Sequence, residues 1–245
     1  MFKQLLTIPL FLATLSIFAE LPAIPKDPIG VKKELLFSDD FQAKELNPAW
    51  KSVVPTFTLA NQALQGTQTR VNAPAADGKP AVVGHAAIVG NDIPTSDSII
   101  ETKICFMGAT ALSVEFDDRK FTGSHYGHIC RVVVTLKDVT LRDEKEGSMR
   151  NDIYEMKDPS QKDAKAKLLV GKSATFPNKL EAEKWYTLQL ETIGDQMRAS
   201  IDGKPVAFLK SPGIAHATKS KIELGCAGKN GLFDEIKVWN AEAGK

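Results

Sequence analysis

The stretch from Arg119 to Arg131 concentrates side chains that can do chemistry. It holds His125, Tyr126 and His128 between the two arginines, and so contains two of the four histidines in the chain. A neutral imidazole is an effective base near pH 7, and a guanidinium group binds a carboxylate through two parallel hydrogen bonds. These residue types suit contact with a sugar, or removal of a proton beside a carboxylate. A polar loop followed by a strand that carries one histidine explains the same residues without a site.

Two acidic residues come just before this stretch on a segment with alternating side chains. Glu115 and Asp117 fall on one face, whereas Val114 and Phe116 fall on the other. The next residue of the acidic series is Arg119, which carries the opposite charge. Acids at the end of a strand are therefore an alternative to a catalytic pair.

A metal site is a further alternative for the histidines. His85, His125 and His128 could ligate an ion if two strand faces and a loop converged. No serine or cysteine is visibly paired with a histidine, and the chain has no Gly-rich phosphate loop. We therefore do not expect serine or cysteine hydrolase chemistry or nucleotide binding.

Antiparallel strands must position these side chains. Residues 184–209 form three alternating runs separated by Gly194-Asp195 and Asp202-Gly203, dipeptides that tolerate the positive φ of hairpin turns. Residues 127–137 are the longest clear strand, with His128 and Cys130 on one face. Many short strands, without an internal repeat or a long amphipathic helix, predict an all-β sandwich of two antiparallel sheets.

The chain divides into four parts by composition. Residues 1–19 carry one lysine before an apolar run that ends at a small residue, which predicts a secretory signal peptide. Residues 20–33 contain three prolines and read as a linker, and one domain is expected from 34 to 240. Within it, residues 137–180 form a charged insertion of balanced sign. We expect a secreted or periplasmic protein with no stable membrane insertion after cleavage.

The overall charge and the cysteine count limit what the chain can be expected to bind and which disulfides it can form. The 245-residue chain has a formal net charge of +1, so nothing in its composition favours nucleic acid. Its three cysteines, Cys105, Cys130 and Cys226, leave at least one thiol without a partner in the chain. A bridge between Cys105 and Cys130 and three buried thiols are both open.

Three motifs together resemble the concanavalin A-like lectin/glucanase superfamily. They are Ser38-Asp39-Asp40-Phe41 followed by Trp50, the strand from Lys184 with its hairpin at 201–204, and the closing segment 233–239. The chain looks most like laminin-G-like domains and the family-16-like domains of 3-keto-disaccharide hydrolase type. The resemblance implies a jelly-roll sandwich of two curved sheets.

The resemblance also implies where ligands would lie. Glycans commonly occupy the concave sheet of this superfamily, and some members bind a structural calcium ion, for which Asp39, Asp40 and Asp234 are the matching acids. Retaining glucanases of the superfamily place a third acid where this chain has Arg119, and jelly-roll lyases use a Tyr or His base with an Arg. We assign Trp185 and Trp239 mainly to the core.

We therefore expect a secreted carbohydrate-binding domain that recognises a polysaccharide or oligosaccharide and requires no cofactor. The alternatives are a glycoside hydrolase or polysaccharide lyase on the same scaffold, and a structural or adhesion domain that binds protein. The catalytic candidates are His125, Tyr126, His128, Glu115 and Asp117. The expected ligand-binding residues are His85, Arg119, His125, Tyr126, His128 and Arg131.

Overall fold

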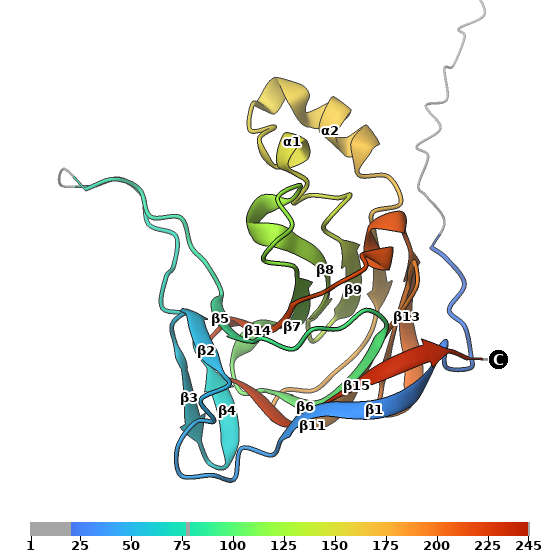
Figure 1. Cartoon of the computed structure of the whole chain (residues 1–245). Coiled ribbons are helices and arrows are strands. Elements are labelled where there is room, and N and C mark those ends of the chain that lie inside the picture. The colour runs from blue at the N-terminus through green and yellow to red at the C-terminus, as the bar shows by residue number, and fades with distance from the viewer. Residues whose placement is uncertain (1–20, 77–78, 245) are drawn as a thin grey trace, which may run out of the picture.

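Two antiparallel sheets packed face to face form the body of the protein in a computed structural model (Figure 1), which describes residues 21–76 and 79–244. The predicted signal peptide lies outside the described residues. The predicted all-β, two-sheet architecture is confirmed. Within the described residues, no helix is long and apolar enough to cross a membrane.

The larger sheet has eight strands in the order β13-β12-β11-β6-β15-β4-β3, with β1 paired to β15. Its bounds in chain order are β1 Gly30–Asp39, β3 Phe57–Ala60, β4 Ala63–Gly66, β6 Ser98–Phe106, β11 Trp185–Ile193, β12 Gln196–Ile201, β13 Lys204–Lys210 and β15 Gly231–Ala243. The predicted meander at 184–209 corresponds to β11, β12 and β13.

The smaller sheet has seven strands in the order β10-β9-β8-β7-β14-β5-β2. Its bounds are β2 Lys51–Val54, β5 Ala87–Asn91, β7 Ala109–Asp117, β8 His128–Val134, β9 Asp138–Asp143, β10 Ser173–Pro177 and β14 Lys221–Gly228. We call this the seven-stranded sheet, and the side turned away from the other sheet its outer face.

The charged insertion is partly structured. It begins with β9, continues through the helices α1 Asn151–Tyr154 and α2 Lys162–Leu168, and returns through β10 to the edge of the sheet. A second projection, residues 70–76 and 79–85, forms an irregular hairpin whose bridges include Arg70 with His85. Figure 1 shows the hairpin leaving the sheet near β5 and the helices rising beyond β8 and β9.

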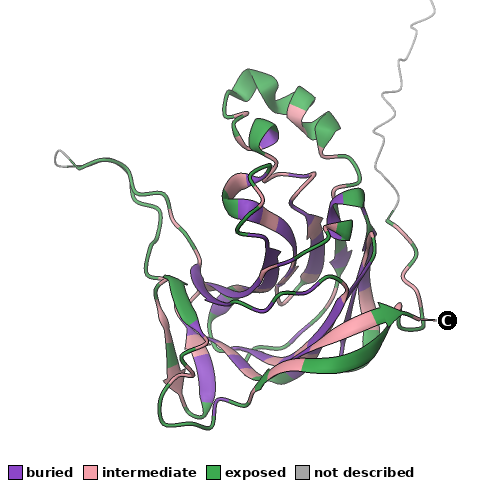
Figure 2. Ribbon diagram, viewed as in Figure 1, coloured by how far each residue is buried: buried purple, intermediate pink, exposed green. Residues whose placement is uncertain are grey.

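Alternation along each strand separates the core from the outer face. On β7, Leu112, Val114 and Phe116 are buried between the two sheets. Ile222 and Leu224 on β14 are buried in the same way, and Figure 2 shows that the buried residues are concentrated where the sheets meet. The intervening residues of these strands must therefore lie on the outer face.

A buried ion pair fastens the segment before β1 to the eight-stranded sheet. Arg198 forms a salt bridge with Glu191, and its guanidinium also donates to the backbone carbonyls of Pro25 and Lys26. Glu191 in turn accepts hydrogen bonds from the backbone N–H groups of Ile29 and Gly30. Strand β1 therefore begins at Gly30, four residues before the expected start of the domain at 34.

The structure decides between the two alternatives for the cysteines, and one expectation about a tryptophan is wrong. All three cysteines are buried free thiols, so no bridge joins Cys105 to Cys130; the first lies on β6 and the second on β8, in different sheets. Trp185 is not a core residue, because it begins β11 and is 40 % exposed.

Loss of the Arg198 side chain tests how strongly this anchor stabilises the fold. Arg198→Met leaves the buried Glu191 charge without its partner, which should lower the free energy of unfolding by about 3–5 kcal/mol. Urea unfolding followed by tryptophan fluorescence measures it. The double variant Arg198→Met/Glu191→Leu should recover part of the loss. Lys33→Met, which breaks an exposed pair with Glu242, should change little; equal losses in both single variants would contradict the anchor.

Candidate functional site

One register row of residues crosses all seven strands of the smaller sheet on its outer face. Successive pairings place Glu223 of β14 opposite Glu115 of β7, Glu115 opposite Arg131 of β8, and Arg131 opposite Arg142 of β9. Directly paired residues in an antiparallel sheet share a face, with Cβ atoms about 4.5–5.5 Å apart. The full row is Lys51, Gly90, Glu223, Glu115, Arg131, Arg142 and Ser173.

A β-bulge brings His128 to the same face. The register between β7 and β8 shifts between Phe116 and Asp117, so that Phe116 pairs with Cys130 but Asp117 pairs with His128. Ile129 is the extra residue, and it is fully buried. A bulge of this kind redirects a side chain relative to simple alternation, which explains how His128 reaches Asp117 while Cys130 stays in the core.

Cations hold the carboxylates of the row and of the neighbouring Asp117 at short range. His128 Nδ1 lies 2.8 Å from Asp117 Oδ1 and 2.9 Å from Glu115 Oε1. Arg119 Nη2 lies 3.1 Å from the other oxygen of Asp117 and also forms a salt bridge with Glu223. A cluster of buried charges thus joins strands β7, β8 and β14 at the centre of the sheet.

Two more basic residues complete this network. Arg131 Nη2 lies 2.6 Å from Glu144 Oε1 and its Nη1 lies 3.5 Å from Glu115 Oε2. Lys221 Nζ lies 3.1 Å from Glu223 Oε1. Lys221 crosses over Gly90, where a Cβ atom would come within 2.3 Å of the Lys221 Cε atom, so the missing side chain makes room for it. We call Glu115, Asp117, Arg119, His128, Arg131, Glu144, Lys221 and Glu223 the ion cluster.

The acids of the ion cluster are buried and the bases face outward. The side chains of Glu115, Asp117, Glu144 and Glu223 are at most 4 % exposed. By contrast, Arg119 is 36 % exposed, and Arg131 and His128 are partly exposed. A molecule that approaches the sheet therefore meets guanidinium and imidazole groups held in place by carboxylates beneath them.

The surroundings shift the pKa values of the two paired glutamates, Glu115 and Glu223, in opposite directions. Burial raises the pKa of Glu115, but the contact with His128 and the charge of Arg131 outweigh it and hold that pKa below its ordinary value. At Glu223, burial and the negative charge of Asp117 prevail over Arg119 and Lys221 and raise the pKa to about 7. Glu115 is therefore ionised at neutral pH, whereas Glu223 is poised near half-protonation.

The two nearby histidines are shifted in opposite directions. Burial lowers the pKa of His128, but Asp117 and Glu115 overcome it and raise that pKa to about 10. Burial and the charge of His128 lower the pKa of His125. At neutral pH, His128 is thus a fixed hydrogen-bond donor, and His125 is the histidine available as a base.

Aromatic rings lie at the edge of the ion cluster. The His125 ring stacks on Tyr154 of α1, with centroids 3.8 Å apart and planes 17° apart, and it meets Tyr126 edge-on at 4.4 Å. Tyr126 is 73 % exposed and has a φ of 50°. A tyrosine held outward beside polar groups offers one face to a flat, partly apolar ligand such as a sugar ring.

The donor atoms of Glu115, Asp117 and His128 could hold a metal ion, because they lie within 4.8 Å of one another. The remaining oxygens of both acids already contact Arg131 and Arg119. Two guanidinium groups at such short range disfavour a further cation, and the raised pKa keeps a proton on His128. A protonated imidazole therefore fits these residues better than a metal ion.

The structure brings together most of the expected site residues. Arg119, His128 and Arg131 meet Glu115 and Asp117 in the ion cluster. The other expected contacts lie around it: His125 and Tyr126 on the short turn before β8, and His85 on the projecting hairpin.

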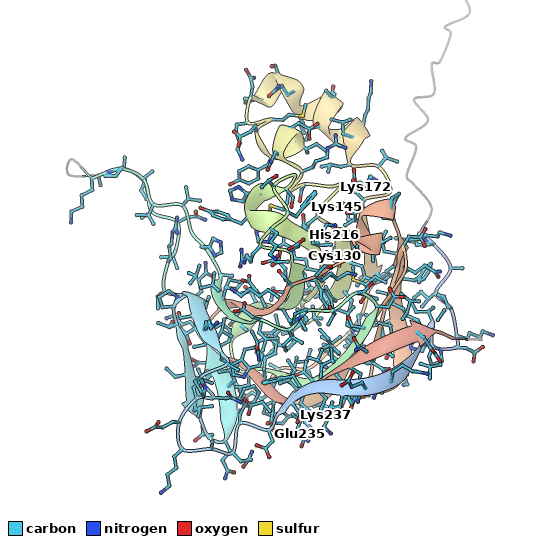
Figure 3. The ribbon with its side chains drawn as sticks, viewed as in Figure 1. Cys130, Lys145, Lys172, His216, Glu235 and Lys237 are labelled. Atoms are coloured by element: carbon cyan, nitrogen blue, oxygen red, sulfur yellow. The ribbon has the colours of Figure 1, made fainter. Side chains whose placement is uncertain are left out.

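The two groups of residues expected as metal ligands are not clustered in the structure. Within the described part of the chain, neither the three histidines nor Asp39, Asp40 and Asp234 place three ligand atoms within 4.8 Å. Both carboxylate oxygens of Asp39 accept protein hydrogen bonds, from Phe41 N and Trp50 Nε1. Asp39 and Asp40 line a groove with Glu235 and Lys237, which Figure 3 places at the opposite end of the molecule from Lys172. Calcium there stays a prediction.

Four members of the site could not be recognised in the sequence. Arg142, Glu144, Lys221 and Glu223 are charged residues at outward positions of strands or strand ends, which is where ordinary surface charges also occur. The only available sequence signal was the alternation along one strand, which puts Lys221 and Glu223 on the face away from Ile222 and Leu224.

Comparisons with solved structures show the fold. The protein is similar to a galectin-like protein of unknown function from Bacillus subtilis, with a TM-score of 0.59 at 11 % identity over 86 % of this chain and 98 % of that one. It is similar to a laminarinase from Flavobacterium sp. UMI-01, with a TM-score of 0.55 at 11 % identity over 84 % and 100 %. For porphyranase B from Zobellia galactanivorans the TM-score is 0.53 at 11 % identity over 91 % and 99 %.

No family model and no curated protein matches the sequence. The expected concanavalin A-like jelly-roll fold is confirmed. At these identities the likeness concerns the fold alone, and the laminin-G-like and 3-keto-disaccharide hydrolase assignments stay predictions.

The raised pKa of His128 predicts a pH-dependent contribution to stability. The folded-state pKa of about 10 exceeds the unfolded value of about 6.5, so the stabilisation is complete below pH 6.5 and is lost as the pH rises towards 10. His128→Gln should lower the free energy of unfolding by roughly 2–4 kcal/mol at pH 6 and by clearly less at pH 9.5.

Urea titrations at the two pH values check this prediction. His85→Gln is the matched control, because that histidine is exposed and, within the described residues, its ring forms a hydrogen bond with the carbonyl of Ala86 and no salt bridge. A His128→Gln penalty that is the same at both pH values would contradict the protonated pair.

Proposed function

We propose that the protein binds a glycan along the outer face of the seven-stranded sheet. The observation that carries this proposal is the register row of polar residues, whose acids are buried and whose basic ends face outward. Sugar hydroxyls and ring oxygens accept hydrogen bonds, and fixed guanidinium and imidazole groups are strong donors to them. The likeness in fold to a laminarinase and a porphyranase supports the same class of ligand.

The surroundings of the row fit an extended ligand. Tyr126 and the stacked His125–Tyr154 pair border the ion cluster, where a sugar ring can pack against an exposed aromatic face. The row itself continues over seven strands, which is a length suited to several sugar units and not to a single small molecule. Among the residues that the structure describes, no comparable feature favours the alternative of an adhesion domain that binds protein.

Tyr126→Asn tests the proposed binding face. Asparagine tolerates the positive φ at this position, so the variant removes the aromatic ring with little backbone strain. Affinity electrophoresis in gels that contain laminarin, agarose, alginate or a sulfated galactan should show a loss of about tenfold in affinity for whichever polysaccharide retards the wild type.

Trp185→Thr is the matched control, because it removes an exposed aromatic ring from the other sheet. It should leave the retardation unchanged. Equal effects of the two variants, or none from Tyr126→Asn, would place the glycan elsewhere, and the absence of retardation of the wild type by every polysaccharide would argue against glycan binding.

Glycoside cleavage is a second candidate, which the pairing of Glu115 with Glu223 favours. Retaining glycosidases use two carboxyl groups about 5 Å apart, one ionised as the nucleophile and one protonated as the acid. Cross-strand partners have Cβ atoms about 4.5–5.5 Å apart, which lets their carboxyl groups approach to that separation, and the environment holds Glu115 ionised and Glu223 near pKa 7. In this function, Glu223 would supply a carboxyl group in place of the third acid that the alternating series Glu115 and Asp117 lacks at position 119, where the chain has Arg119.

Reducing-sugar release from the same polysaccharides tests this second candidate. If the wild type cleaves one of them, Glu115→Gln and Glu223→Gln should each lower kcat by roughly 10²- to 10⁴-fold, because each removes a group that acts in the transition state. Retained folding is checked by circular dichroism. Cleavage that persists in both variants, or binding without any cleavage by the wild type, would exclude this role for the pair.

A further inference from the structure

A cavity of about 230 Å³ lies at one end of the register row, between strands β9 and β10 and the segment that follows α2. Its volume is several times what one water molecule needs. Among its lining side chains are four hydroxyl groups and two cations: Thr140, Ser148, Ser173, Thr175, Arg142 and Lys172. Figure 3 shows Lys172 on the helix-bearing side of the molecule, above Cys130 of β8.

The two cations of this cavity are only partly matched by acids. Within the described residues, neither the Arg142 guanidinium nor Lys172 Nζ donates a hydrogen bond to the protein. The nearest acidic partner of Arg142 is Glu144 Oε1 at 4.0 Å, and Lys172 forms no ion pair in the same residues. Arg142 also stands directly opposite Arg131 across the strands, and Glu144 Oε1 lies beside both, 2.6 Å from Arg131 and 4.0 Å from Arg142, so one carboxylate oxygen faces two guanidinium groups.

The acids that line the cavity are already engaged. Glu144 Oε1 contacts Arg131, and its Oε2 accepts from Ser148 Oγ. Asp143 Oδ2 accepts from Ser211 Oγ and Gly213 N, and its Oδ1 accepts from Glu146 N. The acids of the cavity thus already have partners in the protein, whereas the Arg142 and Lys172 side chains keep donors without hydrogen-bonded partners in the described residues. Burial, together with the adjacent charge of Arg131, lowers the pKa of Arg142.

The geometry points to an oxyanion subsite: we propose that Arg142 and Lys172 bind the carboxylate or sulfate group of an acidic glycan that extends along the row. This inference rests on the proposed glycan binding and adds the chemical class of the ligand. A planar guanidinium binds either group through two parallel hydrogen bonds, and a lysine supplies a second positive charge. Ser173, the residue paired with Arg142 on β10, lies within reach of a third oxygen.

Affinity electrophoresis with charged polysaccharides and their neutralised forms tests the subsite. The probes are alginate with its carboxyl-reduced form, and a sulfated galactan with its desulfated form. We expect the wild type to be retarded by one charged polymer and at least tenfold less by its neutral counterpart. Arg142→Gln and Lys172→Gln should each weaken binding to the charged polymer by roughly ten- to a hundredfold and leave binding to the neutral form unchanged.

Arg150→Gln is the matched control, because the Arg150 guanidinium is similarly exposed but donates to Asp152 through Nε and Nη2. It should not change the retardation. Equal retardation by the charged and neutral forms, or no effect of the two cavity variants, would overturn the proposed subsite. In that case the effect of Tyr126→Asn still tests whether the outer face binds a glycan. Absence of retardation by all four polymers overturns both, and the choice between alginate and the galactan identifies the group as carboxylate or sulfate.

Discussion

The structure of the outer face depends on one constraint, which is that four carboxylates lie out of contact with water in the middle of a sheet. A buried carboxylate without a partner costs several kcal/mol, so each must be matched by a cation at short range. The bases that match them reach in from neighbouring strands and from the segment after β7, with their polar ends left at the surface. The same charge pairing that satisfies the interior thus determines what the exterior presents.

This constraint also explains why the face is rigid and why its groups keep fixed ionisation states. Asp117 and Glu115 hold His128 protonated, and His128 and Arg131 hold Glu115 ionised, so each partner stabilises the charge of the other. Glu223 differs from Glu115 in that its pKa is raised to about 7, because it is buried and lies beside the negative charge of Asp117 as well as beside its cations. A ligand would meet donors whose positions are set before it arrives, which lowers the ordering cost of binding.

The strands were predictable from the sequence because their signals are local. Alternation between apolar and polar residues and the two turn dipeptides at 194–195 and 202–203 identified β11, β12 and β13, and the inward and outward faces of β7 followed from the same period of two. The facing of His128 was not predictable, since strict alternation puts it on the face of Cys130. The bulge at Ile129 reverses it, and a bulge arises from pairing with another strand.

The site was predictable only where its members are close in sequence. Arg119, His128 and Arg131 could be grouped because thirteen residues contain them all, but Glu223 joins them through a strand pairing between positions more than a hundred residues apart. That pairing changes how the acids Glu115 and Asp117 of β7 are interpreted. From the sequence, Arg119 interrupts the acids and argues against catalysis; in the fold, Arg119 is one of the cations that hold a replacement carboxyl beside Glu115. Arg119 forms a salt bridge with the same carboxyl, so in the proposed cleavage Arg119 would have to move before Glu223 could donate a proton, whereas the proposed recognition requires only that Arg119 stay in place. The two proposed functions therefore differ in what they require of Arg119, and the position of Arg119 in the structure favours binding.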